Sequence, residues 1–458
     1  MRQNLAQGRV GVTLLKFAGP FLLASLLQAL YGAADLFVVG RFADAAAVSG
    51  VSIGSQIMQT LTGVILGLSM GGTVLIGQRV GEADDPGAAR AVGTMGVLFT
   101  AAALVLTPLM LLLTDGAVAL LDTPAQAVED TREYLLICSC GIPFIIGYNA
   151  VGGIFRGLGD SRTPLYFVAL ACGINIALDF LLTGALGWGA AGAAAATVAA
   201  QAVSFVTALL YLVRRGLPFS FRKEGASPWR PGKREMAAIL KVGFPLALQD
   251  ALVNISFLII TAVINAMGLV ASAAVGVVEK LLVFAFLPLT AFSSAVAAMT
   301  AQNIGAGRRD RAVRVLGCGI AWSLLFGGLF CLYAQFFPAT LTRLFTNEAA
   351  VIAAAAEYLK AYAIDCMLTP FLFCFTGYYN GCEKTLFVMI QGIIGAFFVR
   401  IPVAYLMSRM AGATLFQIGL STPASSVVQI LLCLSMFLFL ERRSAGQSHA
   451  SLKGSADP

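Results

Sequence analysis

The sequence predicts an all-α integral membrane protein with twelve transmembrane helices, arranged as two parallel six-helix repeats around a central cavity. Three observations support this fold class. The chain of 458 residues is 59% hydrophobic and 12% charged, whereas soluble domains carry about 25% charged residues. Apolar runs long enough to cross a bilayer, which takes about 20 residues, recur along the chain. Residues of the first half also recur, in order, in the second half.

The apolar runs fall into two groups of six that are separated by a polar, basic linker. The first group lies at 13–40, 48–78, 88–113, 132–155, 162–184 and 188–213, and the second at 237–267, 271–301, 312–337, 355–379, 385–408 and 416–440. We therefore expect an amino-terminal lobe over 1–213, a cytoplasmic linker over 214–236, a carboxy-terminal lobe over 237–440 and a polar cytoplasmic tail over 441–458.

An internal duplication follows from matched residues at a nearly constant spacing. Pairs that share one identical spacing are Gln78 and Gln302, Gly81 and Gly305, Arg90 and Arg314, Gly93 and Gly317, Glu133 and Glu357, and Gly157 and Gly381. At a spacing one position longer, Lys16 and Pro20 match Lys241 and Pro245. An ordered series in one register indicates a repeated unit. Because six is even, both halves enter the membrane in the same direction, and the cavity between the lobes is the expected substrate path.

The basic residues predict the orientation of the chain. They concentrate in loops on the side of the membrane that carries both termini, and such loops are normally cytoplasmic. We therefore expect a multi-pass protein of the plasma membrane with both termini in the cytoplasm. The net charge of +7 reflects these loops and does not indicate a nucleic-acid partner. The few basic residues expected on the opposite side are Arg41, Arg132, Arg343, Lys360 and Arg409.

Cysteine and histidine usage excludes several kinds of chemistry. The nine cysteines include no CxxC pair, and the one histidine, His449, lies in the polar tail. Neither residue type has the spacing of a metal site, and the chain contains no GxxxxGK[ST], HExxH or GxSxG motif. We expect no enzyme, no catalytic residue and no cofactor. Any ion coupling within the membrane must use carboxylates.

The stretch from Asn175 to Gln201 contains the strongest candidate site. Asp179 lies in an apolar helix, Asn175 lies four residues earlier on the same face, and Thr197 lies on the next helix. An aspartate at the centre of a membrane helix costs roughly 2.5–3.5 kcal/mol on insertion scales, so it normally faces a bundle interior. Asp35 lies at a similar depth, about five residues before the outer end of its helix. A buried polar cluster that only fixes helix packing is the alternative.

These features together resemble the multidrug and toxic compound extrusion (MATE) transporters. The resemblance covers nearly the whole chain and rests on the order and spacing of several pieces. They are AADLFVVGRF in the first helix, GQRVGEAD and its copy AQNIGAGRRD, FRGLGDSRTPL after the fourth helix, NIALDF with GAAGAAAATVAAQ, and YYNGCEKT after the tenth helix. The resemblance implies export of cationic or amphipathic organic compounds, driven by inward flow of Na⁺ or H⁺.

The resemblance also implies roles for individual residues. Asp35, Asn175, Asp179 and Thr197 match the family's cation site in the amino-terminal lobe, with Na⁺ as the one metal expected there. Asp35 maps near Ile259 or Ile260 in the second half, so the site is not duplicated. That half instead offers Asp250, Glu279 and Asp365 as candidates for ion coupling or for lining the substrate cavity. Structural alternatives remain for these acids, including an ion pair between Glu279 and Lys280.

The sequence favours a secondary antiporter over a flippase for lipid-linked precursors, the alternative of a related fold. An anionic pyrophosphate lipid would be expected to require several arginines in the central cavity, and Lys280 and Arg400 are the basic residues within the apolar runs considered for that role. We expect a monomer that works in membrane lipid on drug-like substrates. Carboxylates can bind Na⁺ or a proton, so the sequence leaves the coupling ion open, as it does the physiological substrate.

Overall fold

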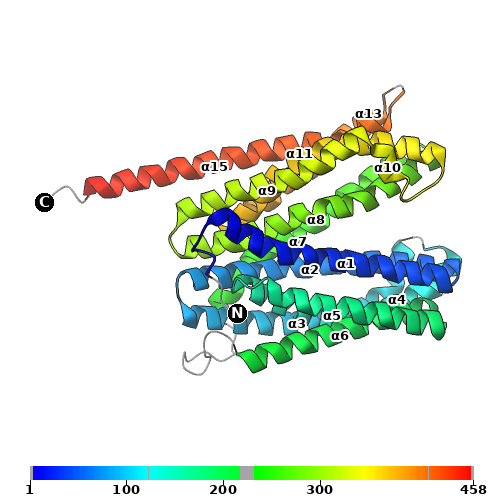
Figure 1. Ribbon diagram of the computed structural model, residues 1–458, viewed down its shortest axis with the longest axis horizontal. Helices are drawn as coiled ribbons and strands as arrows, with labels where there is room; N and C mark the ends of the chain where they lie inside the picture. The colour runs from blue at the N-terminus through cyan, green and yellow to red at the C-terminus, as the bar shows by residue number, and fades with distance from the viewer. Residues whose placement is uncertain (1–3, 122, 217–231, 411, 455–458) are drawn as a thin grey trace. The chain divides into compact units, whose positions relative to one another are not determined.

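The computed structural model describes residues 4–121, 123–216, 232–410 and 412–454 (Figure 1). Most of the predicted linker, 217–231, and the last residues of the predicted tail, 455–458, lie outside the described residues. The described chain is helical and contains no strand. Its elements are α1 (Val10–Phe42), α2 (Ala45–Gly81), α3 (Asp85–Leu120), η1 (Ala125–Ala127), α4 (Val128–Gly157), α5 (Arg162–Asp179), η2 (Phe180–Ala185), α6 (Gly189–Arg215), α7 (Lys233–Asn265), α8 (Leu269–Gly305), α9 (Arg309–Phe336), α10 (Pro338–Thr342), α11 (Ala349–Gly381), α12 (Thr385–Ile393), η3 (Ile394–Arg400), α13 (Ile401–Ser408), α14 (Leu415–Gly419) and α15 (Ser421–Gly454).

Twelve helical segments of the described chain are long and apolar enough to cross a membrane, which confirms the predicted fold class. Most begin or end within about one turn of the predicted runs. At the starts of α2 and α3, a polar side chain caps the helix. Asp44 accepts a hydrogen bond from the backbone N–H of Ala47 at the start of α2, and Asp84 accepts one from Gly87 at the start of α3. The fifth segment of each half contains a π-helical stretch, η2 or η3.

The chain forms two compact units by its internal contacts. Unit 1 comprises Met1–Ala251, Thr290–Gly319 and Gly377–Leu386, and unit 2 comprises Leu252–Leu289, Ile320–Thr376 and Phe387–Pro458. The predicted lobes follow the sequence repeat, whereas unit 1 also gathers helix ends from the second half of the chain.

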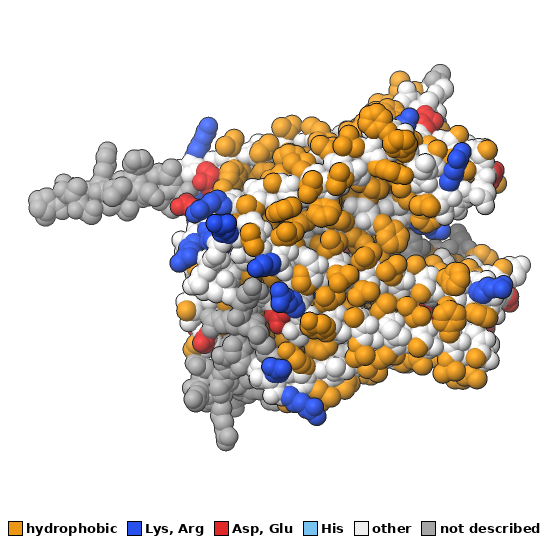
Figure 2. Space-filling view, viewed as in Figure 1, with side chains coloured by type: hydrophobic (Ala, Val, Ile, Leu, Met, Phe, Trp, Pro, Cys, Tyr) orange, Lys and Arg blue, Asp and Glu red, His pale blue; other side chains and the backbone are white. Residues whose placement is uncertain are grey.

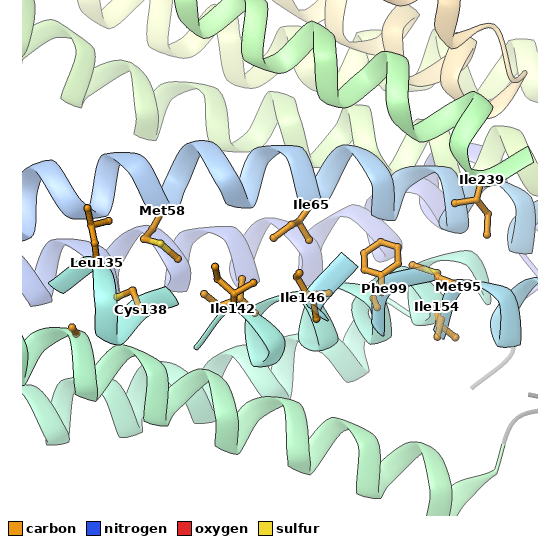
Figure 3. Packing of buried hydrophobic residues seen from close by; sticks show 14 of the residues in the cluster. Met58, Ile65, Met95, Phe99, Leu135, Cys138, Ile142, Ile146, Ile154 and Ile239 are labelled. Atoms are coloured by element: carbon orange, nitrogen blue, oxygen red, sulfur yellow. The ribbon is translucent and has the colours of Figure 1, made fainter. Parts of the chain in front are cut away.

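Each unit has an apolar core of its own. In unit 1, one cluster lies among α2, α3 and α4 and includes Met58, Ile65, Phe99 and Ile142 (Figure 3). In unit 2, a cluster drawn from α7, α8, α11, α13 and α14 includes Ile264. Because lipid is as apolar as these side chains, such packing stabilises a membrane bundle mainly through close van der Waals contact.

The outward faces of the helices are also apolar. Hydrophobic side chains spread over the visible flanks of the helices (Figure 2), and Leu112 and Leu269 are 81% and 86% exposed. A water-soluble monomer rarely exposes a large continuous apolar surface. These faces fit contact with lipid chains.

Within unit 1, the ends of α2 and α8 meet in a reciprocal contact, which we call the glutamine clasp. Gln78 donates a hydrogen bond from Nε2 to the carbonyl oxygen of Gly381, at 3.3 Å. Gln302 donates from Nε2 to the carbonyl oxygen of Gly157, at 3.0 Å. Each donor and each acceptor is the repeat counterpart of the other, so the clasp has approximate two-fold symmetry. Gln302 also accepts a bond from the backbone N–H of Leu5 through Oε1.

Two glycines allow the helices of the clasp to approach this closely. A Cβ atom on Gly305 would collide with the backbone carbonyl oxygen of Gln78, and one on Gly81 would collide with that of Gln302. Both obstacles are backbone atoms that cannot rotate away. The matched Gln and Gly pairs of the two repeats therefore form one crossing.

We expect Gly305→Ala to destabilise the protein by about 1–3 kcal/mol, the usual cost of overpacking. Gly317→Ala is the matched control, because a Cβ atom on Gly317 of α9 would meet no atom within 4 Å, and alanine favours a helix by about 1 kcal/mol. Thermal unfolding of the two purified variants checks this expectation. Equal stability of the two variants would contradict the close crossing.

Candidate cation-binding site

The four residues predicted to form a cation site come together in unit 1. Asp35 lies on α1, Asn175 and Asp179 lie in the last two turns of α5, and Thr197 lies on α6. These helices pack against one another. Asp35, Asn175 and Asp179 are 6%, 1% and 0% exposed, so the polar groups face the bundle interior, as their cost in lipid requires.

Thr197 connects the other side chains through its hydroxyl group. It donates a hydrogen bond from Oγ1 to Oδ2 of Asp35, at 3.2 Å, and accepts one from Nδ2 of Asn175, at 3.4 Å. Because the single hydroxyl proton points to Asp35, the Asn175 amide must supply the second bond from its N–H side. This fixes the orientation of the amide and leaves its oxygen available.

Four buried oxygen atoms of the cluster lack a hydrogen-bond donor in the described part of the chain. They are Oδ1 of Asp35, Oδ1 of Asn175, and both carboxyl oxygens of Asp179. The two carboxyl groups lie close enough to interact electrostatically. Two ionised carboxylates in a low-dielectric site repel each other unless a proton or a cation lies between them. The site therefore has the oxygen ligands and the negative charge that a monovalent cation or a proton needs.

A π-helical stretch begins directly after Asp179. Stretches of this kind frequently occur at functional sites, and η2 is held by local contacts to the start of α6. Thr183 donates from Oγ1 to the carbonyl oxygen of Gly189, at 3.3 Å. Gly192 allows the approach, because a Cβ atom there would meet Oγ1 of Thr183 at 2.8 Å. The connection from α5 to α6 thus begins with a turn of wider helix.

Two further residues extend the cluster and were missed by the sequence reasoning. Gln201 on α6 donates from Nε2 to the hydroxyl oxygen of Tyr31 on α1, at 3.3 Å. Tyr31 lies four residues before Asp35, and Gln201 lies four residues after Thr197. The i,i+4 spacing of polar residues on both helices is a signal that could have identified them.

The three further acids lie outside this cluster. Asp250 of unit 1 is exposed on α7, where its carboxyl group lies against Gly63 of α2. In unit 2, Asp365 is 3% exposed and accepts a bond from Oγ1 of Thr369 at 3.0 Å. Glu279 is exposed and accepts a bond from Thr261 at 3.2 Å. The alternative of an ion pair between Glu279 and Lys280 is wrong, since no such pair forms in this part of the described chain.

Arg400 ends η3 in unit 2 and is 6% exposed. It donates from Nη1 to Oγ of Ser256 at 3.1 Å, and its guanidinium group lies 4.4 Å from the centre of the Phe257 ring. Such stacking on an aromatic face stabilises a desolvated cation. Asp365 interacts with it electrostatically across a greater distance.

Comparison with known families decides the identity of the fold. The MatE family model matches the chain twice, at residues 20–181 and 245–406. The chain belongs to the MatE family. The start and the end of the second match are displaced from those of the first by the same number of positions, which confirms the internal duplication. Members of the MATE family are multidrug efflux transporters and not enzymes, and they are multi-pass membrane proteins.

Individual MATE relatives are similar over most of their length. The chain is 29% identical to the probable multidrug resistance protein YpnP of Bacillus subtilis, covering 91% of this chain and 93% of the relative. It is 29% identical to the probable multidrug resistance protein NorM of Thermotoga maritima, covering 89% and 86%. A crystal structure of MATE in complex with MaL6 has the same fold, with a TM-score of 0.88, 21% identity, and coverage of 97% and 99%.

The displacement between the two family matches shows how the halves of this MATE chain differ at the site. When the same displacement in residue number is added to the positions of the acidic cluster, Asn175 corresponds to Arg400, Asp179 to Ala404 and Asp35 to Ile260. Both acids of the first half are thus replaced by apolar residues, and the amide is replaced by a cation.

We expect Asp35→Asn and Asp179→Asn to stabilise the protein at alkaline pH in buffer without Na⁺. Each change removes one of two facing buried charges, and the gain should be roughly 1–3 kcal/mol, the scale of an unsatisfied buried polar group. Thermal unfolding of purified protein checks this. Asp115→Asn is the control, because Asp115 is exposed and paired with Arg132. Lower stability of both site variants would show that the carboxylates are already compensated.

Proposed function

We propose that this MATE chain is a secondary active antiporter that exports organic cations or amphipathic drugs in exchange for Na⁺ or H⁺. The observation that carries the proposal is the set of four buried oxygens without donors around Asp35 and Asp179. A structural polar cluster would be expected to satisfy its own acceptors. This one leaves two carboxyl groups in contact, a state that a bound proton or cation stabilises.

Coupling then requires that ion and substrate prefer different conformations. A ligand shifts a conformational equilibrium only by its difference in affinity between the states. Ion binding draws Asp35 on α1 toward Asp179 on α5, so it favours a closed arrangement of these helices. A substrate that needs them apart would compete with the ion without touching the same atoms.

The names of the relatives support the substrate class. Two relatives from Bacillus subtilis and Thermotoga maritima are described as probable multidrug resistance proteins, and drug-like compounds are the class we propose here. Asp250, Glu279 and Asp365 remain candidates for lining the substrate path or for secondary ion binding.

We further propose that the protein acts as a monomer in the cell membrane with both termini in the cytoplasm. The basic loops support this orientation. The glutamine clasp then lies on the cytoplasmic side, since Arg79 lies in the last turn of α2 and Arg308 lies just after the end of α8. Release of the clasp is required before a substrate can enter the protein from the cytoplasm.

The decisive experiment measures ethidium transport by the protein in reconstituted vesicles, with Na⁺ and proton gradients imposed separately. We expect one gradient to drive transport in the native protein. Asp179→Asn should reduce driven transport at least roughly tenfold, within the range of typical coupling free energies, because a neutral amide can neither take up the proton nor balance the cation.

The control is Asp115→Asn, which removes an exposed carboxylate outside the cluster and should transport like the native protein. Transport that responds to neither gradient would refute the antiport mechanism. Driven transport that survives Asp179→Asn unchanged would refute the assignment of the site.

A further inference from the structure

A cavity in unit 1 lies apart from the acidic cluster. It has a volume of about 260 Å³ and is bounded by α1, α2, α4, the start of α5, and α8. Its walls combine apolar side chains, among them Phe21, Leu66 and Met70, with hydroxyl and amide groups such as Ser25 and Gln28. This mixture of an apolar body and a few polar groups is typical of sites for small organic ligands.

Arg156 is the charged residue of the cavity wall, and no acidic residue lines the described cavity. Its guanidinium group donates from Nη2 to Oγ of Ser69 at 3.2 Å and lies 5.9 Å from the centre of the Phe21 ring. No carboxylate of the described chain forms an ion pair with it, and Tyr148 is the titratable side chain that interacts with it electrostatically. The cavity therefore contains an uncompensated positive charge.

The side chain of Arg156 extends inward from the end of its helix. Arg156 is the next-to-last residue of α4, where an arginine normally extends toward the lipid headgroups. Its partners lie deeper. Ser69 donates a hydrogen bond to the carbonyl oxygen of Asn149, which lies seven residues before Arg156 on α4. By the rise of 1.5 Å per residue, Ser69 is therefore about 10 Å deeper along that helix than the Arg156 backbone.

This inward position needs a reason beyond helix packing. The Arg156 side chain is partly exposed and lies beside apolar side chains of the cavity, where a charge is costly unless a partner or solvent compensates it. Arginine presents planar pairs of N–H donors that match a carboxylate or a phosphate, which makes those groups its best partners. In this structure the guanidinium group of Arg156 contacts the Ser69 hydroxyl and the Phe21 ring, and neither group carries a negative charge.

We propose that this cavity binds an amphipathic anion, with a carboxylate or phosphate group on Arg156 and an apolar body against Phe21, Leu66 and Met70. Ser161 and Pro164, at the start of α5, also line the cavity. An organic cation is disfavoured there, because Arg156 repels it. The inference concerns binding and does not depend on the antiport mechanism proposed above.

The test measures ligand binding to the whole protein in nanodiscs of neutral phosphatidylcholine. The probes share one ring and differ in charge: benzoate, phenyl phosphate, benzyl alcohol and benzylammonium. We expect benzoate and phenyl phosphate to bind more tightly than the other two. Arg156→Gln should weaken the binding of both anions roughly 10- to 100-fold, the scale of hydrogen bonds to a charged group, while Arg156→Lys should weaken it less.

Arg132→Gln is the matched control, because Arg132 lies on the same helix, is exposed, and pairs with Asp115. It should leave anion binding unchanged. Addition of phosphatidylglycerol to the nanodiscs distinguishes the source of the natural ligand. Competition with benzoate would indicate a lipid headgroup, and no competition would indicate a soluble compound.

Two results would overturn the inference. One is native protein that binds benzylammonium or benzyl alcohol as tightly as benzoate, and this comparison does not depend on any variant. The other is a monodisperse Arg156→Gln protein with native affinity for both anions. Because no ion gradient is applied, loss of anion binding and loss of ion-driven transport are separate outcomes.

Discussion

Every backbone polar group inside a bilayer must find its partner within the protein, and an unsatisfied group costs several kcal/mol. This constraint makes the described chain helical almost throughout. The helices have already satisfied the backbone, so polar side chains within the bundle need partners of their own. Three sets of polar side chains in unit 1 illustrate this: the glutamine clasp, the acidic cluster around Asp179, and the cavity with Arg156. They use their polar groups differently. The clasp satisfies its amide groups, whereas the other two leave charge uncompensated.

The duplication is preserved in the glutamine clasp and lost at the acidic cluster. At the ends, Gln78 and Gln302 exchange equivalent bonds, and glycines at equivalent places permit the crossing. Such a contact needs the same residue in both repeats, because each copy supplies half of it. A site within one repeat has no such requirement, so its residues can diverge. Matched positions therefore keep the same residue where the two repeats contact each other, and they differ where the repeats do not.

The sequence could predict the twelve spans and the four residues of the acidic cluster, because both depend on simple lengths and periodicities. Hydrophobic length identifies a span, and the i,i+4 spacing of Asn175 and Asp179 identifies a face. The contact of these residues with Asp35 could be predicted because Asp35 and Asp179 lie at similar depths in their helices. What the sequence could not predict depends on side-chain direction or local winding. From the sequence, Arg156 is expected near a helix end and a loop. The inward direction of its guanidinium group depends on the side-chain rotamer, which the sequence does not give. The π-helical stretches have no simple signature either.

The two halves of the chain differ in how their buried charges are compensated. In the first half, Asp35 and Asp179 face each other, and no basic side chain of the described chain forms an ion pair with either. In the second half, the position equivalent to Asn175 is occupied by Arg400, whose guanidinium group is held by Ser256 and Phe257. With Asp365 in the same region, that half carries both signs of charge. The two halves of the duplicated fold therefore differ in charge at matched positions: the first half places two acids together, and the second half places a cation in the region of an acid.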